Sequence, residues 1–248
     1  MRVTLPALAT IVLLAGCGGG TPVATTADPN GEPHFAVEQT PAPKSHPAGP
    51  AGRYKTAHVL RRTTLRASPG GHVLARIGRR TEFGSERVLA VIGRRAGWLR
   101  VIVAERENGR RGWIRARAAR LGATDISIKV DRSARRLMLR RGDEVLRRFP
   151  IAVGRPGNET PLGRFAVTDR LRTQTADSPY GCCALALSGH QTKLVPGWPG
   201  GDRLAIHGTP NEETVGTEAS LGCIRAYTND IRALVRRVPL GAPVFVRA

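Results

Sequence analysis

The C-terminal half of the chain alternates hydrophobic and polar residues over short runs, a pattern typical of β-strands with one buried face. Residues 126–130 read ISIKV and carry an apolar side chain at every second position. Two apolar runs, 137–139 and 145–149, flank the turn-forming residues 141–143, so a β-hairpin is predicted there. Further strands are expected at residues 163–167, 184–187, 204–206 and 242–246. This half is therefore predicted to be a mixed β-sheet domain.

One stretch near the C-terminus has helical rather than strand periodicity. Its apolar residues fall on a single helical stripe: Ile231, Leu234 and Val235. Thr228 or Asn229 is expected to cap the helix with a side-chain oxygen, and Pro239 follows its end. The predicted fold class is thus mostly β, with one short helix in the C-terminal domain.

Residues 56–122 predict a second, smaller unit of β-rich runs separated by turns. Asn108-Gly109 marks a hairpin loop between the runs 98–103 and 112–114. The segments LRASPGG, GWLRV and NGRRGWI resemble those of bacterial SH3-like domains. The resemblance implies a small barrel that serves as a binder of wall peptides or glycans, or as a spacer. Trp98 and Trp113 are expected to pack in the core and at its rim rather than to form a ligand cage.

The first 17 residues have the pattern of a lipoprotein export signal. Arg2 precedes an apolar run at 5–16, whose twelve residues are fewer than the ~20 that span a bilayer. The run ends in LAGC, which predicts cleavage before Cys17 and lipid attachment to its sulfur. An ordinary signal peptide cut nearby is the alternative. We therefore expect an exported protein, anchored by lipid to the outer face of the cytoplasmic membrane.

Residues 18–55 have the composition of a disordered linker. They hold seven Pro and six Gly in 38 positions, with almost no apolar periodicity. Such a segment cannot bury enough surface to offset the entropy of ordering it. When extended it would reach on the order of 100 Å, so an anchored protein could work within the cell wall.

The chain is strongly basic, which predicts attraction to polyanions. The formal net charge is +20, and only four of the 39 basic residues are Lys. Nucleic acid is not the expected partner, because an exported chain does not meet the chromosome and no basic patch is interleaved with aromatic residues. Wall carboxylates, anionic wall polymers and lipid headgroups are the expected counter-ions. The preference for Arg also fits a bias in genomic base composition.

Two of the four cysteines are adjacent, Cys182 and Cys183. Their spacing lacks the C-x-x-C of a zinc site, and neighbouring cysteines form a disulfide only with strained geometry. We expect two free thiols here, with a vicinal disulfide as the alternative. No metal or other cofactor is expected.

The segments LAIHGT at 204–209 and SLGCIR at 220–225 carry the strongest chemical signal. A thiol with an ordinary pKa of ~8.5 is mostly protonated at neutral pH, so Cys223 needs a base to become a nucleophile. His207 could take that proton and return it to a leaving group. Gly222 would let the backbone approach a substrate, so that amides near Cys223 hold a developing oxyanion.

These segments resemble the signature of the L,D-transpeptidase catalytic (YkuD-like) family, which is H-G-[ST], about fifteen residues, then [ST]-x-G-C-[IV]-[RN]. Fifteen residues separate His207 from Cys223, and the other signature positions match. Upstream, GRP at 154–156 and TPLGRF at 160–165 are similar to a further family segment. The resemblance implies a catalytic domain at 125–247. One departure is Leu221, where many members have a second His.

The resemblance also implies roles for individual residues. Cys223 would be the acylated nucleophile and His207 its base, with the imidazole oriented by the backbone carbonyl of Gly208. The amides of Gly222 and Cys223 would hold the oxyanion. Three further residues are candidates for substrate contacts, with loop shaping or packing as the alternative: Ser220, Arg225 and Tyr180.

The implied reaction is acyl transfer between peptidoglycan stem peptides, by a protein expected to be a monomer. Cys223 would attack a stem tetrapeptide, release D-alanine and pass the acyl group to an amine of a neighbouring stem. Water in place of the amine would make the protein a carboxypeptidase. A non-catalytic, anchored wall-binding protein is a second alternative. An NlpC-type hydrolase has its Cys before its His, and a sortase has a longer His–Cys spacing, so both fit less well.

Overall fold

The structure is a computed structural model of the 248-residue chain, and it describes residues 35–36, 53–173, 178–198 and 200–248. The predicted export signal with Cys17 and most of the predicted linker lie outside the described residues. Within the described ranges, no helix is long and apolar enough to cross a bilayer. The described residues are mostly β, as predicted, with one α-helix among them.

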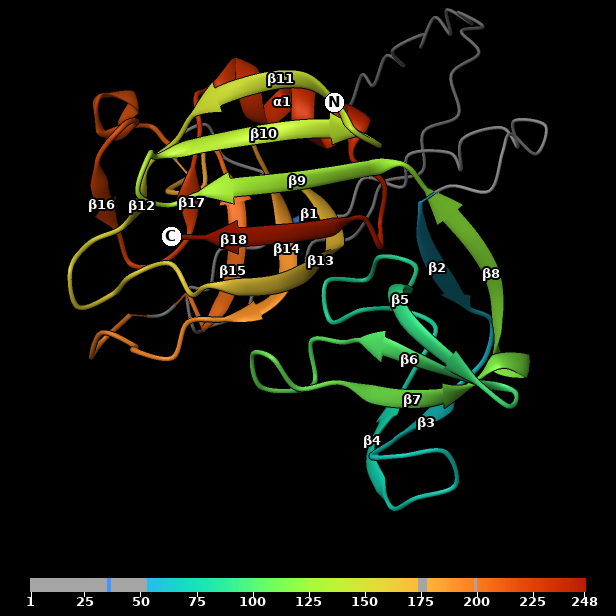
Figure 1. Ribbon diagram of the computed structural model, residues 1–248. Helices are drawn as coiled ribbons and strands as arrows, with labels where there is room; N and C mark the ends of the chain where they lie inside the picture. The colour runs from blue at the N-terminus through green and yellow to red at the C-terminus, as the bar shows by residue number, and fades with distance from the viewer. Residues whose placement is uncertain (1–34, 37–52, 174–177, 199) are drawn as a thin grey trace, which may run out of the picture. The chain divides into compact units, whose positions relative to one another are not determined.

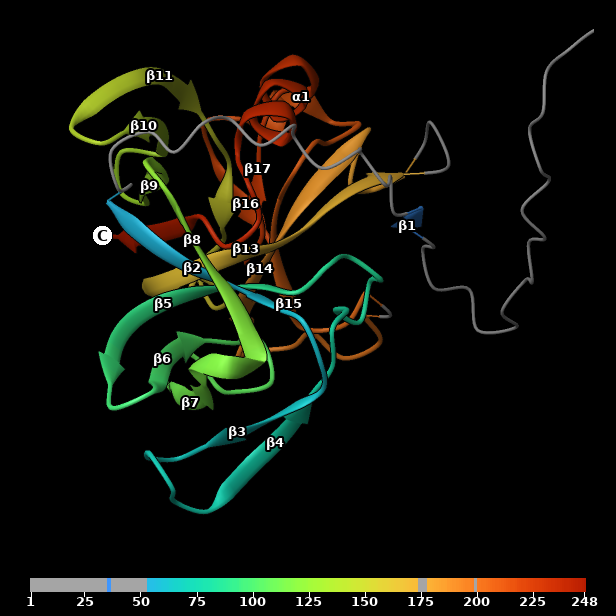
Figure 2. The same cartoon turned by 90° about the vertical axis from the view of Figure 1, so that its right-hand side faces the viewer.

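The N-terminal sheet has seven strands in the order β4-β3-β7-β6-β5-β2-β8, and all neighbouring strands in it are antiparallel. The strands are β2 (Tyr54–Val59), β3 (Thr63–Arg66), β4 (Val73–Ile77), β5 (Val88–Arg95), β6 (Trp98–Ile102), β7 (Gly112–Arg115) and β8 (Ala119–Thr124). A 3-10 turn, η1 (Ala116–Ala118), joins the last two. Leu65, Leu99 and Ile114 belong to the hydrophobic core of this sheet and are fully buried. Figure 2 shows β2 and β8 running side by side. The likeness to an SH3-like barrel stays a prediction.

The C-terminal sheet has nine strands and is mixed. Its main path is β11-β10-β9-β18-β13-β14-β15-β17 (Figure 1), with parallel pairs at β9–β18 and β15–β17. These strands are β9 (Ile126–Asp131), β10 (Arg136–Arg141), β11 (Glu144–Pro150), β13 (Gly163–Thr173), β14 (Cys183–His190), β15 (Arg203–His207), β17 (Ile224–Arg225) and β18 (Pro243–Arg247). A separate two-stranded sheet pairs β12 (Val153–Gly154) with β16 (Glu218–Ser220), and a 3-10 turn, η2, spans Glu212–Thr214.

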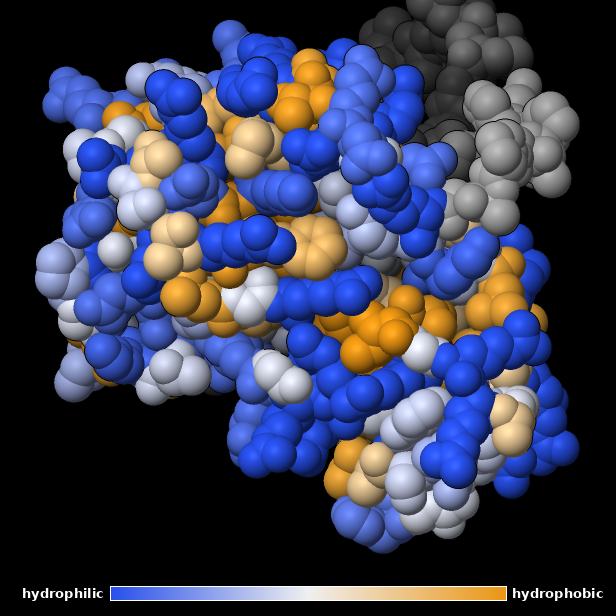
Figure 3. Space-filling model, in the orientation of Figure 1, coloured by the Kyte–Doolittle hydropathy of each residue, from blue (hydrophilic) through white to orange (hydrophobic). Residues whose placement is uncertain are grey.

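The strands predicted from alternation are present in the C-terminal sheet. Residues 126–130 lie in β9, where Ile128 and Val130 are buried. The predicted hairpin is β10–β11, and its turn glycine, Gly142, has a φ of +57° that suits a residue without a side chain. Figure 3 shows that hydrophilic residues cover much of the visible surface, with hydrophobic atoms exposed in smaller patches. The apolar face of each strand therefore supplies the core, as the alternation predicts.

The helix α1 (Thr228–Arg237) packs its predicted apolar stripe on the sheet beside β14, and Ile231 and Leu234 are fully buried. The predicted cap is wrong. The N-cap residue is Tyr227, without a side-chain cap, and the Thr228 amide donates instead to the carboxylate of Glu212 at 2.8 Å. A carboxylate at a helix N-terminus satisfies a free N–H and complements the helix dipole. The capping group thus comes from η2, a distant part of the sequence.

A short strand lies inside the predicted linker. β1 (Phe35–Ala36) pairs antiparallel with Thr173 and Arg172 at the end of β13. Strand β18 pairs only with residues 163–166 of β13, so the backbone at the far end of β13 keeps an open edge on that side. The pairing of β1 satisfies backbone groups that would otherwise need water.

The parallel pairing of β15 with β17 brings the two signature segments together. Ile206 lies opposite Ile224 and His207 opposite Arg225. His207 is therefore the last residue of β15, and Cys223 directly precedes β17. The fold places both residues at the same edge of the sheet, although fifteen residues separate them in the sequence.

Candidate active site

A pocket of about 80 Å³ lies where β15 meets the loop before β17. It is lined by both residues of the predicted pair, His207 and Cys223. The predicted substrate contacts also line it: Tyr180, Ser220 and Arg225. Trp198 contributes to the rim and is 39% exposed. The structure thus gathers in one cavity residues that the sequence spreads from 180 to 225.

His207 is buried and has its imidazole fixed on one side. Its Nδ1 lies 2.5 Å from the carbonyl oxygen of Gly208. A carbonyl oxygen can only accept, so Nδ1 carries the hydrogen and Nε2 is left as the acceptor in the neutral ring. The ring of Tyr180 meets the imidazole edge-on, with centroids 5.0 Å apart. Burial lowers the pKa of His207 to about 4, so the ring is a neutral base at physiological pH.

Cys223 is half-buried and its thiol is a weak acid in this setting. Burial raises the pKa of Cys223, and a backbone hydrogen bond at Ala205 and the charge of Arg225 offset part of that rise. The Sγ atom lies 3.8 Å from the carbonyl oxygen of Arg203. Cys223 is the free cysteine of the described residues. At neutral pH the site therefore holds a neutral thiol and a neutral imidazole rather than a charged pair.

The loop 220–223 is held by its own serine. Ser220 Oγ donates to the carbonyl oxygen of Cys223 at 2.5 Å and accepts from the Gly222 amide at 3.0 Å. The Gly222 amide, which the sequence analysis expects to be an oxyanion donor, donates to Ser220 inside the loop in this structure. Gly222 has a φ of +124°, a conformation that side chains rarely adopt.

Two residues that sequence reasoning did not assign hold the same loop from outside. Thr160 Oγ1 donates to the Gly222 carbonyl oxygen at 2.8 Å and accepts from the Gly154 amide at 2.9 Å. Gln191 Nε2 donates to the Leu221 carbonyl oxygen at 2.8 Å. Thr160 lies in the TPLG segment, which was a usable signal, whereas nothing in the sequence marks Gln191. Both are buried, so these bonds are shielded from water.

The turn before β14 lies against the backbone that carries His207. A Cβ atom on Gly181 would lie 2.7 Å from the carbonyl carbon of Gly208, so only glycine fits there. The Gly208 amide donates to the Cys183 carbonyl oxygen at 3.2 Å. Cys182 and Cys183 are bonded to each other in this turn, so the expectation of two free thiols is wrong. The sharp turn at Gly181, with a φ of +62°, sets the two side chains beside each other.

Arg225 of β17 lies opposite His207 of β15 and lines the pocket. Its Nε is buried and has no hydrogen-bond partner within the described part of the chain. A buried guanidinium nitrogen without a partner is costly unless a ligand anion meets it.

The C-terminal sheet matches known proteins. Residues 125–246 match the profile of the YkuD family, the L,D-transpeptidase catalytic domain. A Bacillus subtilis protein named as the L,D-transpeptidase YkuD is 33% identical over 119 residues, which cover 48% of this chain and 64% of that protein. The ErfK/SrfK L,D-transpeptidase of Escherichia coli is 30% identical over 109 residues, covering 39% of this chain and 35% of that protein.

Among solved structures, an L,D-transpeptidase of Mycobacterium tuberculosis H37Rv is similar with a TM-score of 0.42 at 17% identity, over 58% of this chain and 67% of that one. The chain spans 64% of the length of the Bacillus subtilis relative. Residues 125–246 of this chain are therefore similar in sequence to the catalytic domain of the L,D-transpeptidase (YkuD) family.

Proposed function

We propose that this protein is a peptidoglycan L,D-transpeptidase that works through a thioester on Cys223. The observation that carries the proposal is the shared pocket of His207 and Cys223, in which the Gly208 carbonyl oxygen leaves His207 Nε2 as the acceptor. A neutral imidazole beside a neutral thiol is the resting state that general-base activation of a nucleophile needs.

In the first half-reaction, Cys223 Sγ attacks the carbonyl carbon before the terminal D-alanine of a stem tetrapeptide. His207 Nε2 takes the thiol proton as the S–C bond forms. The oxyanion is held by the Cys223 amide, since Gly222 donates to Ser220. The tetrahedral intermediate collapses when the C–N bond breaks and His207 gives the proton to the leaving nitrogen. The products are D-alanine and a thioester.

In the second half-reaction, an amine of a neighbouring stem attacks the thioester carbon. His207 takes a proton from that amine, the C–S bond breaks, and the proton returns to the sulfur. Arg225 holds a carboxylate of a stem peptide, and Tyr180 keeps the imidazole in its orientation. The carboxypeptidase alternative differs only in this step, since water then replaces the amine.

The remaining assignments complete the proposal. Lipid on Cys17 anchors the exported protein to the membrane, and the linker lets the catalytic domain reach the wall. The small sheet at 54–124 is an SH3-like module. The protein works as a monomer on peptidoglycan without a metal or cofactor.

The test is a purified disaccharide tetrapeptide incubated with wild type and with Cys223→Ala, with D-alanine and cross-linked dimer followed by mass spectrometry. Wild type should release D-alanine and form dimer, and the variant should do neither. Release without dimer would favour the carboxypeptidase. Equal release by the variant would overturn the assignment of the nucleophile. Ser220→Ala serves as a control that alters the loop but keeps the thiol.

A further inference from the structure

A groove of about 790 Å³ lies in the N-terminal sheet, apart from the pocket that holds Cys223. It opens because the β3–β4 hairpin stays with the sheet through a single residue pair, Arg66 opposite Trp113. The hairpin therefore diverges from β7. The lining comes from the segment before β3, from both hairpin strands, from the ends of β6 and β7, and from η1.

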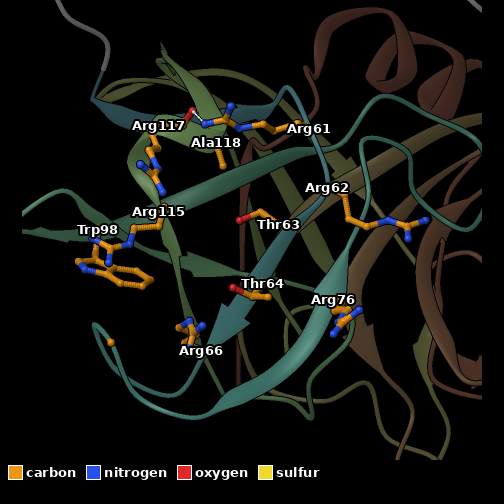
Figure 4. A pocket seen from close by; sticks show the side chains of 11 residues that line it. Arg61, Arg62, Thr63, Thr64, Arg66, Arg76, Trp98, Arg115, Arg117 and Ala118 are labelled. Carbon is orange, nitrogen blue, oxygen red and sulfur yellow. Dashed lines mark hydrogen bonds between the residues drawn. The ribbon is translucent and has the colours of Figure 1, made fainter.

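The charged residues of the lining are all arginines. Among the residues that the structure describes, six arginines and two threonines line the groove and no acidic residue does: Arg61, Arg62, Arg66, Arg76, Arg115, Arg117, Thr63 and Thr64. Figure 4 shows the arginines around Thr63 and Thr64, which lie near the middle of the view. Six like charges around one hollow repel one another, so the arrangement is relieved by a bound anion.

The acidic residues of this region do not neutralise these arginines. Residues 53–124 contain eighteen Lys and Arg but only four Glu. Each of the four lies beside a basic residue outside the groove: Glu82 with Arg203, Glu86 with His58, Glu105 with Arg87 and Glu107 with Arg110. The groove arginines thus keep their full charge for a ligand.

Three of the arginines are held by neutral groups, which fixes their position without cancelling charge. Arg66 Nη1 donates to the Gly71 carbonyl oxygen at 2.6 Å, and Arg61 Nη2 to the Arg117 carbonyl oxygen at 3.1 Å. The Arg115 guanidinium lies 4.0 Å from the centroid of the Trp98 ring. A guanidinium fixed in this way loses less entropy when it pairs with phosphate or carboxylate.

The shape and the lining residues of the groove indicate which class of polyanion it fits. Trp98 is the aromatic residue of the lining, is 5% exposed, and has a face covered by Arg115, so it offers little surface on which a base could stack. A flat lipid surface does not fill a hollow of about 790 Å³. A flexible chain with closely spaced oxyanions and no aromatic groups fits both features.

We propose that this groove binds a linear anionic polymer of the cell wall, through repeating phosphate or carboxylate groups on a non-aromatic chain. The location of that polymer in the wall rests on the proposed function, but the groove chemistry does not. The polymer would hold the enzyme near its substrate without entering the pocket of Cys223.

The test measures binding of the full chain to soluble poly(glycerol phosphate) and to polyuronate, at several salt concentrations. The variant Arg62→Gln/Arg117→Gln removes two groove charges, and the control Arg79→Gln/Arg95→Gln removes two exposed charges elsewhere in residues 53–124, one after β4 and one in β5. The groove variant should weaken binding about tenfold at low salt and lower the salt slope by about 2, as expected for two lost anion contacts. The control should change binding less than about threefold.

The two polymers distinguish the sources, since preference for one names phosphate or carboxylate as the group bound. Three results would overturn the proposal: equal loss in both variants, binding to anionic vesicles but to neither polymer, or much tighter binding of single-stranded DNA than of a polymer of equal charge. Release of D-alanine from a soluble tetrapeptide, measured alongside, should be the same in both variants and wild type. Failure of binding and failure of catalysis are thereby read separately.

Discussion

The pocket at Cys223 lies in a mixed sheet and the arginine groove in an antiparallel one, and the two differ in size and in charge. The pocket measures about 80 Å³ and holds a neutral imidazole and a neutral thiol, whereas the groove measures about 790 Å³ and carries six unneutralised arginines. General-base activation of a thiol starts from an uncharged imidazole that can accept a proton, and burial keeps His207 uncharged at neutral pH. Holding a polyanion needs charges that do not titrate, and exposed guanidinium groups provide these.

The two regions also differ in how their charges are balanced. Residues 125–248 contain nineteen Lys and Arg against twelve Asp and Glu, but residues 53–124 contain eighteen against four. The net positive charge of the chain is thus concentrated in the smaller region. This difference teaches that most of the +20 comes from the smaller region, which carries 18 − 4 = +14, while residues 125–248 carry 19 − 12 = +7.

The largest expected effect comes from Gly181→Ala, which should damage the pocket and leave the groove intact. The new Cβ would lie 2.7 Å from Gly208 backbone atoms, at a φ of +62°. Strain and overpacking together should cost about 4 kcal/mol of unfolding free energy and about 100-fold in activity. Chemical denaturation and D-alanine release measure the two losses.

The matched control is Gly142→Ala, which has a similar φ of +57° but nothing within 4 Å of the new Cβ. It should cost only the backbone strain, about 1 kcal/mol. Equal losses in the two variants would show that the contact between Gly181 and Gly208 does not matter. Binding of anionic polymer should be unchanged in both.

Protonation of His207 should come next in size. Its pKa of about 4 in the folded protein lies below the ordinary 6.5, so between these values the unfolded chain binds a proton that the folded one does not. Unfolding free energy should therefore fall by about 3 kcal/mol as pH drops from 6.5 to 4. Urea unfolding of wild type and His207→Gln across this range isolates that contribution. The same pH slope in both proteins would contradict the buried neutral imidazole.

The pH dependence of D-alanine release should also reflect the protonation of His207. Because His207 stays neutral well below pH 6.5, D-alanine release should be nearly constant from pH 8 to 5 and fall toward pH 4. A loss of activity centred near pH 6.5 would instead indicate an exposed histidine. Polymer binding, which depends on guanidinium groups, should show no such change over this range.

A smaller effect is expected from Thr160→Val, which keeps the side-chain shape and removes one hydrogen bond to the loop 220–223 and one to Gly154 of β12. The variant leaves the Gly154 amide and the Gly222 carbonyl oxygen without their partner. Activity should fall about tenfold, since each unsatisfied buried group costs about 1–3 kcal/mol and part of that cost reaches the loop. Thr217→Val, which removes an exposed bond to Thr214, is the control and should be neutral. Equal activity of the Thr160→Val and Thr217→Val variants would show that Thr160 does not position the loop 220–223.

Local patterns predicted the elements, while long-range contacts decided the details. Alternation at 126–130 was enough to predict β9, and the apolar stripe was enough to predict α1. The cap of α1 could not be predicted, because Glu212 reaches Thr228 from another segment. The alternation of apolar and polar residues is a property of neighbouring positions in the sequence. The capping of a helix by a carboxylate from another segment depends on contacts that exist only in the folded chain.

The site shows the same division. The motif marked His207 and Cys223, and the structure places both in one pocket. Gln191 could not be recognised, because its amide matters only through the Leu221 carbonyl oxygen that the fold brings to it. The arginine groove was equally hidden: the sequence showed the excess of charge, but only the diverging β3–β4 hairpin shows where that charge gathers.

The most direct measurement is to trap the acyl-enzyme. The full chain is mixed with a tetrapeptide donor in the absence of acceptor, quenched in acid, digested and mapped by mass spectrometry. The account predicts a mass increase equal to the donor minus D-alanine on the peptide that contains Cys223, and none in Cys223→Ala. An adduct on the peptide that contains Cys182 and Cys183, or D-alanine release without any adduct on Cys223 at early times, would contradict it.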